Sequence, residues 1–180
     1  MSTKQSNLLT VDWSLVAPPR DDGAAAHLTG MMLPEIALIG THDRPITLAK
    51  LRGRTVVFAY PRTGVPGKPS LAEDWDQIPG ARGCTPQSCA FRDLHRDLKD
   101  AGAATVFGLS TQSTPYQREA RDRLHLPFEL LSDESLAFSA ASTSLWVDFS
   151  SRVIWATSGG PRACSLIDGY SSLIWRNVFV

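Results

Sequence analysis

The sequence has little cysteine, no excess charge of either sign and no long hydrophobic run. Three cysteines in 180 residues are too few for a disulfide scaffold. Eighteen basic residues balance eighteen acidic ones, so no overall field draws the chain to nucleic acid or to an anionic membrane. No uncharged apolar stretch is long enough to span a membrane, and the first residues show no secretory signal pattern. We therefore expect a soluble, cytoplasmic protein that binds neither nucleic acid nor membranes.

The length suits a single domain with a substantial core, because 43% of the residues are hydrophobic. Residues 1–30 are rich in Pro, Asp, Ala and Gly, which is typical of an extension lying on the domain. We predict an N-terminal extension over residues 1–30 and one domain over residues 31–180. The sequence has no heptad pattern that would indicate an oligomer, so we expect a monomer or a weak dimer.

Apolar runs typical of buried strands alternate with helical patterns along this domain. "RTVVFAY", residues 54–60, predicts a central parallel strand that is buried on both faces. The next helix is expected to have Thr85 as its N-cap and Pro86 as its first residue, and to continue to a stop at Gly102. The remaining predicted elements are short strands within 33–41 and 44–53, a buried strand over 104–111, a helix over 114–126 opened by a capping box at Thr114 and Gln117, strands over 127–133 and 152–157, and a hairpin over 163–180. This order predicts an α/β thioredoxin-like fold with a mixed sheet flanked by helices.

Cys84 follows the central strand and stands where the next helix begins. In an α/β sheet, the loops at the carboxyl ends of the strands form the crevice where ligands bind. The free N–H groups and the positive dipole end of a helix stabilise a thiolate, and Arg82 can add a positive charge. We therefore expect the Cys84 thiol to be more acidic than the usual value of about 8.5.

Cys89 lies five residues after Cys84 and is expected to be a buried thiol in the same helix. The Cα atoms of two such residues are about 8.6 Å apart in an intact helix, whereas a disulfide tolerates at most about 7 Å. The pair can therefore bond only after the first turn unwinds. This spacing indicates a cycle of sulfenic acid, disulfide and reduction by a dithiol. A zinc clamp is disfavoured because the third cysteine and the four histidines offer no second pair of ligands, and two unreactive thiols remain the alternative.

The segment "GCTPQSCAFRD" resembles the motif of the peroxiredoxins, in particular the Q-type or bacterioferritin-comigratory group of the AhpC/TSA superfamily. "RGRTVVFAYP" before it, and "VFGLST" and "LPFELLSD" after it, follow the order of that family. The resemblance implies a thioredoxin-like fold and a peroxidase that reduces hydrogen peroxide and organic hydroperoxides with electrons from thioredoxin or a similar dithiol, without a metal or other cofactor. It also implies that Cys84 is the peroxidatic cysteine and Cys89 the resolving cysteine, joined by a disulfide in the oxidised protein.

The resemblance assigns further residues to the site. "GPRACSLIDG" resembles the segment that supplies the active-site arginine, which would be Arg162. The substrate pocket would be lined by Pro61, Thr63, Gly83 and Thr85. In this chain an inserted loop, residues 64–82, separates Pro61 and Thr63 from Cys84, and loops of that length are usually functional or disordered.

Two other functions remain open from the sequence. A thiol–disulfide oxidoreductase of the thioredoxin type would use the same cysteines, although its motif is C-x-x-C and this pair has four residues between the cysteines. A thioredoxin-fold binding or chaperone module that has lost catalysis is the alternative from a different class. Rapid reaction of Cys84 with equimolar peroxide would distinguish a peroxidase from either.

Overall fold

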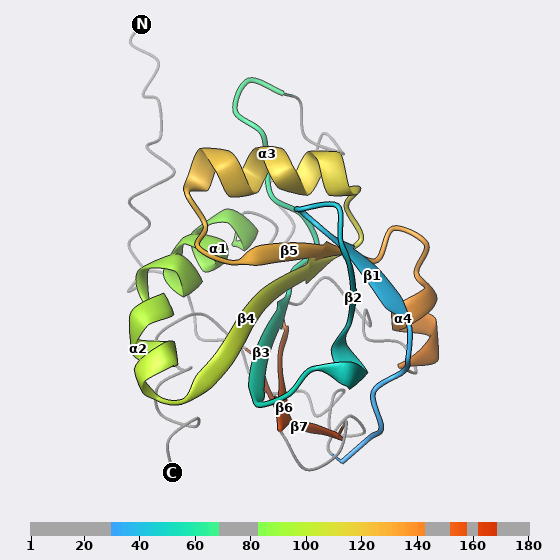
Figure 1. Cartoon of the computed structure of the whole chain (residues 1–180). Coiled ribbons are helices and arrows are strands. Elements are labelled where there is room, and N and C mark those ends of the chain that lie inside the picture. The colour runs from blue at the N-terminus through green and yellow to red at the C-terminus, as the bar shows by residue number, and fades with distance from the viewer. Residues whose placement is uncertain (1–29, 69–82, 143–151, 158–161, 169–180) are drawn as a thin grey trace, which may run out of the picture.

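The computed structural model describes residues 30–68, 83–142, 152–157 and 162–168, the last two ranges by their backbone alone. A seven-stranded mixed sheet runs through the molecule in the order β2-β1-β5-β4-β3-β6-β7 (Figure 1). The strands are β1 (Ala37–Gly40), β2 (Pro45–Thr47), β3 (Arg54–Ala59), β4 (Ala103–Ser110), β5 (Glu129–Ser132), β6 (Arg152–Thr157) and β7 (Arg162–Asp168). The helices are α1 (Cys84–Asp93), α2 (His95–Asp100), α3 (Thr114–Leu124) and α4 (Ala137–Ala141), with a 3-10 turn at Leu48–Lys50.

Three neighbouring strands, β3, β4 and β5, are parallel and form the middle of the sheet. β1 and β2 continue the sheet on one side and β6 and β7 on the other, all through antiparallel pairings. Because parallel strands end at the same edge, the segments after β3, β4 and β5 are brought together there. This edge holds the candidate site.

The side chains of β3 alternate between two hydrophobic clusters, one on each face of the sheet. Val56, Phe58 and Tyr60 join the cluster that packs under α1, α2 and α3, and Val57 and Ala59 join the cluster that packs under α4. This alternation is the period of two that a strand buried on both faces requires. The predicted buried central strand is therefore present, with β4 parallel on one side and β6 antiparallel on the other.

α1 is fixed to the sheet by an aromatic contact. The rings of Phe91 and Phe58 are stacked with their centroids 4.1 Å apart, and Phe128 meets Phe58 edge-on at 5.6 Å. Offset stacking and edge-to-face packing are the arrangements that aromatic rings favour. The helix that begins with Cys84 is thereby held against the end of β3.

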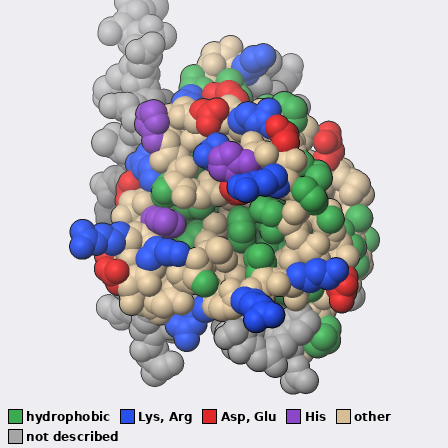
Figure 2. All heavy atoms as spheres, viewed as in Figure 1, with side chains coloured by type: hydrophobic (Ala, Val, Ile, Leu, Met, Phe, Trp, Pro, Cys, Tyr) green, Lys and Arg blue, Asp and Glu red, His purple; other side chains and the backbone are tan. Residues whose placement is uncertain are grey.

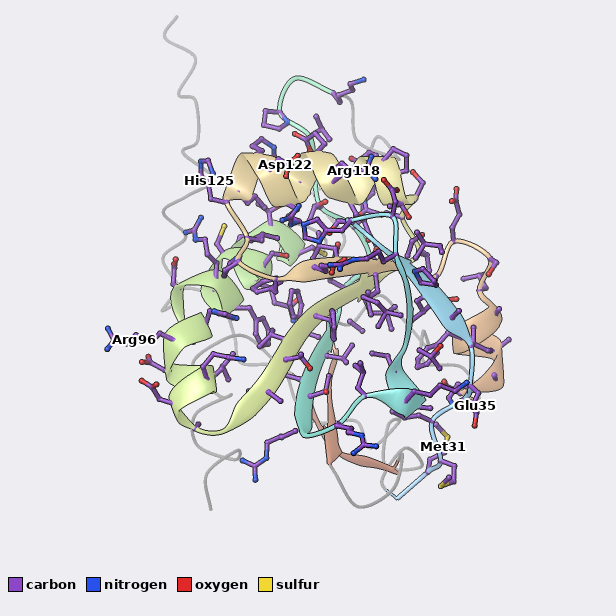
Figure 3. The ribbon with its side chains drawn as sticks, in the orientation of Figure 1. Met31, Glu35, Arg96, Arg118, Asp122 and His125 are labelled. Carbon is purple, nitrogen blue, oxygen red and sulfur yellow. The ribbon has the colours of Figure 1, made fainter. Side chains whose placement is uncertain are left out.

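α3 packs on the same face as α1 and shows a clear division into buried and exposed sides. Ala120 and Leu124 are buried in the cluster under the helices, whereas Asp122 and His125 are exposed. The outward side chains Arg118, Asp122 and His125 are labelled in Figure 3. The spacing of three to four residues between the buried positions is that of an amphipathic helix.

Three predicted details of the helix after β3 are wrong. α1 begins at Cys84 with Gly83 as its N-cap residue, so Thr85 is not the N-cap and Pro86 is not the first helical residue, and both lie inside the first turn. The expected single helix is interrupted at Leu94, although the hydrogen bonds from Leu94 N to Ala90 O and from Leu98 N to Leu94 O continue across the interruption. The apolar spacing therefore stays helical, which is why the sequence does not reveal the break.

The capping box predicted for α3 does not form. Ser113 is the N-cap residue and no side chain caps the helix. The Gln117 side chain turns instead to the sheet and donates to the carbonyl oxygen of Leu131 at 3.0 Å. Of the predicted hairpin over 163–180, only the first strand can be placed: it pairs with β6, and residues 169–180 lie outside the described ranges.

Candidate active site

Cys84 is the first residue of α1 and faces the end of β3. Its side chain is only 1% exposed and belongs to the hydrophobic cluster that also contains Phe58, Tyr60 and Phe91. The backbone N–H groups of Arg62 and of Cys84 itself favour the charged form of the sulfur and so lower its pKa. The sequence-predicted position of Cys84, after the central strand and at a helix start, agrees with the structure.

The sequence predicts a low pKa for the Cys84 thiol, but the residues that the structure describes do not produce one. Burial raises the pKa of the Cys84 thiol, and the two backbone N–H groups offset this only in part. A buried thiolate loses its hydration, and two N–H dipoles return less than a full positive charge would. The cations that the sequence suggested, the side chains of Arg82 and Arg162, lie outside the described residues.

Tyr60 directly follows β3 and adds a titratable group beside the sulfur, which the sequence analysis did not assign to the site. It is fully buried, and its hydroxyl has no hydrogen-bond partner among the described residues. Burial and the charge of Cys84 both raise the pKa of Tyr60, so it stays protonated while Cys84 titrates. Its place directly before Pro61 is the only sequence signal that could have pointed to it.

Pro61 and Thr63 form a turn that is held from β4 and α3. The Ser110 hydroxyl donates to Pro61 O at 3.0 Å. Thr63 is fully buried, and its backbone N–H and its hydroxyl both donate to Gln112 Oε1, at 3.0 and 3.2 Å. Tyr116 Oη donates to Thr63 O at 3.1 Å. In this structure the Thr63 hydroxyl proton is thus directed to Gln112, whose role the sequence analysis missed.

Gly83 and Thr85 flank the cysteine in the chain. The carbonyl oxygen of Gly83 accepts the N–H of Gln87 at 2.8 Å, which closes the first turn of α1, and Thr85 is half-buried. Gln87 is buried, and no donor among the described residues reaches its Oε1. The assignment of Gly83 and Thr85 to a substrate pocket stays a prediction.

Cys89 lies in the same unbroken helix as Cys84, and both are free thiols. The sequence predicts a buried Cys89, but it is only half-buried at the edge of the core. Burial is the largest influence on the Cys89 thiol and raises its pKa. The cations Arg92 and Arg123 lower the pKa in part, whereas Asp93 raises it further. The helix that separates the two sulfurs is therefore intact in this reduced form.

Arg162 is the first residue of β7 and pairs with Thr157 of β6. β6 lies next to β3, so the backbone places Arg162 two strands away from the strand that leads to Cys84. Its side chain lies outside the described residues, and its catalytic role stays a prediction.

The charges on one face and the arrangement of potential metal ligands do not indicate a second site among the described residues. Acidic and basic side chains are mixed on the face shown in Figure 2, as the balanced composition leads one to expect. Within the described ranges, no three His, Cys, Asp or Glu side chains lie close enough to hold a metal ion. None of the helices described here is long and apolar enough to cross a membrane.

Comparison with known proteins identifies relatives of this chain. It is 37% identical over 120 residues to a protein named "Peroxiredoxin Q, chloroplastic" from Sedum lineare, covering 66% of this chain and 55% of the relative. It is 28% identical over 156 residues to "Peroxiredoxin Bcp" from Bacillus subtilis, covering 84% of this chain and 86% of the relative. The chain thus spans about half the length of the plant relatives it matches.

Solved structures support the fold. Peroxidoxin BcpB from Mycobacterium tuberculosis matches with a TM-score of 0.59 and 21% identity over 78% of this chain and 85% of that one. A Xanthomonas campestris peroxiredoxin Q matches with a TM-score of 0.59 and 17% identity over 89% of both chains. The predicted thioredoxin-like fold is thereby confirmed, as is the resemblance to the Q-type and bacterioferritin-comigratory group. The family model described as Redoxin matches residues 28–157, and the chain therefore belongs to the Redoxin family.

Proposed function

We propose that this chain is a thiol-dependent peroxidase that reduces hydrogen peroxide and organic hydroperoxides through Cys84. The observation that carries the proposal is the setting of this cysteine: a buried sulfur at the start of α1, whose charged form is favoured by two backbone N–H groups. Such donors stabilise the negative charge that sulfur and oxygen share during attack on a peroxide. The named peroxiredoxin relatives support the same reaction.

The reaction uses two electrons from the sulfur. The Cys84 thiolate attacks one peroxide oxygen, the O–O bond breaks, and the other oxygen leaves as water or an alcohol after taking a proton. Cys84 is then a sulfenic acid. The Cys89 sulfur attacks it, water leaves, and a Cys84–Cys89 disulfide forms. A dithiol reductant supplies the two electrons that restore both thiols.

We propose that the Arg162 side chain supplies a positive charge at the Cys84 sulfur. Among the described residues, no cation has a resolved effect on the pKa of Cys84. Burial raises the pKa of Cys84, and a positive charge nearby would favour the thiolate again. Pro61, Thr63, Gly83 and Thr85 are proposed to line the substrate pocket. The N–H and the hydroxyl of Thr63 both donate to Gln112, so Thr63 would line the pocket without offering either donor to the peroxide.

Thioredoxin or a similar dithiol is the proposed reductant, and the proposed state is a cytoplasmic monomer or weak dimer. The half-buried position of Cys89 supports a dithiol reductant, because the reductant must reach one sulfur of the disulfide. The domain division at residue 30 stays a prediction. The relatives do not favour the alternatives of a disulfide oxidoreductase or of a binding or chaperone module without catalysis.

Stopped-flow mixing with equimolar hydrogen peroxide tests the proposal. Cys84 of the reduced chain should be oxidised far faster than a free thiol, and Cys84→Ser should abolish the reaction. Cys89→Ser should keep the first oxidation, lose recycling by thioredoxin and expose Cys84 to overoxidation, whereas the control Cys164→Ser should turn over normally. A free-thiol rate at Cys84 would contradict the proposed function, and normal turnover of Cys89→Ser would exclude Cys89 as the resolving cysteine.

A further inference from the structure

Gln112 lies just beyond the end of β4 and is buried, with an exposed fraction of 7%. Its carboxamide spans to the turn after β3, 49 residues away in the chain. Oε1 accepts from the N–H and the hydroxyl of Thr63, and Nε2 donates to Thr63 O at 3.4 Å. One side chain thus forms three of the hydrogen bonds that hold Thr63.

Gln112 is itself held in place at the sheet edge. Its backbone N–H donates to Ser110 Oγ at 3.2 Å, and its carbonyl oxygen accepts the Ser132 hydroxyl at 2.7 Å. Ser110 and Ser132 end the parallel strands β4 and β5 and pair with each other in the sheet. Because the backbone of Gln112 is anchored to two strand ends, its carboxamide can position a neighbouring loop with little freedom, since buried polar networks are rigid when every member is satisfied.

The turn that Gln112 holds contains the backbone N–H of Arg62, which acts on the charge of the reactive sulfur. Arg62 lies between Pro61, whose carbonyl accepts from Ser110, and Thr63, which is bonded to Gln112. Its peptide group is therefore fixed from both sides, and its N–H favours the charged form of the Cys84 sulfur. The Arg62 guanidinium lies over the Tyr116 ring, 4.6 Å from the centroid, which fixes the residue from a third direction.

We propose that Gln112 is a positioning residue for the Cys84 thiolate: its carboxamide fixes the Pro61–Thr63 turn so that the Arg62 N–H points to the sulfur. The inference rests on the proposed peroxidase function for its catalytic meaning and on the hydrogen bonds alone for its structural meaning. Without the carboxamide, the buried N–H and hydroxyl of Thr63 lose their acceptor, and a buried donor left unpaired is costly enough to make the turn rearrange. The Arg62 N–H then moves away from Cys84.

Among the described residues, few other groups act on the charge of the Cys84 sulfur. Tyr60, the residue after β3, is the described titratable side chain whose charge interaction with Cys84 is resolved, and it stays protonated because burial raises its pKa. Among the described residues, the other backbone group that favours the charged sulfur is the N–H of Cys84, which belongs to α1 and does not depend on Gln112. A change at Gln112 should therefore act on the sulfur through Arg62.

The test replaces Gln112 with Met, which has a similar length and no hydrogen-bonding amide. The full chain carries Cys89→Ser and Cys164→Ser, so that Cys84 is its only thiol, and the thiolate is followed by its ultraviolet absorbance during a pH titration, with Cys84→Ser as the blank. We expect the Q112M titration to move to higher pH and the oxidation by peroxide at neutral pH to slow by about tenfold, the factor that corresponds to one pKa unit.

Q117M is the matched control, because Gln117 is also buried but donates to Leu131 O and Ser110 O and leaves the Pro61–Thr63 turn alone. Its thiolate titration should coincide with that of the parent. Amide hydrogen exchange at Arg62, measured by NMR, should become faster in Q112M. If Q112M fails to fold, Q112N, which keeps the amide but is one methylene shorter, is expected to show the same two changes.

The outcomes separate the positioning role from the proposed function. Coincident thiolate titrations of the parent and of folded Q112M, or of Q112N in its place, would overturn the positioning role. Equal shifts in Q112M and Q117M would also overturn it, because the effect would then be a general loss of packing. The titration needs no peroxide, so it reports on Gln112 even if Cys84 proves unreactive toward hydroperoxides.

Discussion

The sulfur of Cys84 is subject to two opposing effects. Burial disfavours its ionisation, whereas the N–H groups of Arg62 and Cys84 favour it. Because the thiolate is the nucleophile, the rate of reaction with peroxide should rise with pH until the thiol is fully ionised. Any cation supplied at the sulfur shifts that rise toward lower pH.

Arg162→Ala tests whether this residue is that cation. Loss of the charge should raise the pKa of Cys84 and slow oxidation by peroxide at neutral pH by at least about tenfold, since one pKa unit changes the thiolate fraction tenfold. Arg96→Ala is the control, because Arg96 is 91% exposed on α2. Stopped-flow rates across a pH series provide the measurement. Superimposable pH profiles for the parent and Arg162→Ala would show that the arginine is wrongly placed.

At the level of single residues, the sequence predicts the position of the two cysteines but not the residues that surround them. Cys84 and Cys89 are recognisable because they lie close together in one short motif. Gln112 and Tyr116 reach the site across 49 and 53 residues of chain, and their types and spacing carry no local signal. The cost of burying the sulfur also depends on the packing of Phe58, Tyr60 and Phe91, which the local sequence does not contain.

Helix α1 has to open before its two sulfurs can bond. An intact helix keeps Cα atoms five residues apart at about 8.6 Å, beyond the reach of a disulfide. The buried Ser88 hydroxyl donates to Cys84 O at 2.9 Å and so adds a second bond to the first turn. Phe91, stacked on Phe58, holds the following turn to the sheet. Opening is therefore expected to involve the first turn rather than the whole helix.

Ser88→Ala removes the extra bond and should make the first turn open more readily. A hydrogen bond with a net worth of about 1 kcal/mol corresponds to roughly a fivefold faster formation of the disulfide once the sulfenic acid is present. Rapid acid quenching followed by mass measurement gives that rate. The oxidation of Cys84 itself should be little changed, and a disulfide that forms more slowly than in the parent would show that opening of this turn does not limit resolution.

The elements themselves were predicted better than their ends. Strands such as β3 and β4 have continuous apolar runs, and α3 has a clear stripe, so periodicity identifies them. The break at Leu94 escapes because the apolar stripe and the hydrogen bonds continue across it. The capping box at α3 fails because Gln117 finds acceptors on the sheet, a tertiary contact that outweighs the local motif.

In the whole molecule, the parallel strands β3, β4 and β5 bring the segments after them to one edge. The segment after β3 contributes Pro61–Thr63, and the segment after β4 contributes Gln112, while the chain returns to the same edge at the start of α1. The class of fold follows from the alternation of strands and helices. The strand order and the cross-sheet hydrogen bonds follow only from packing, so they were beyond the sequence.

The proposed reaction cycle of the whole chain depends on an intramolecular disulfide between Cys84 and Cys89. It is tested most directly by mass spectrometry of the full chain after treatment with equimolar hydrogen peroxide, with proteolysis under conditions that preserve disulfides. We expect a peptide pair linked by a disulfide between Cys84 and Cys89, and an intact mass that corresponds to a single chain. A bridge that involves Cys164, a disulfide between two chains, or two unmodified thiols would contradict it.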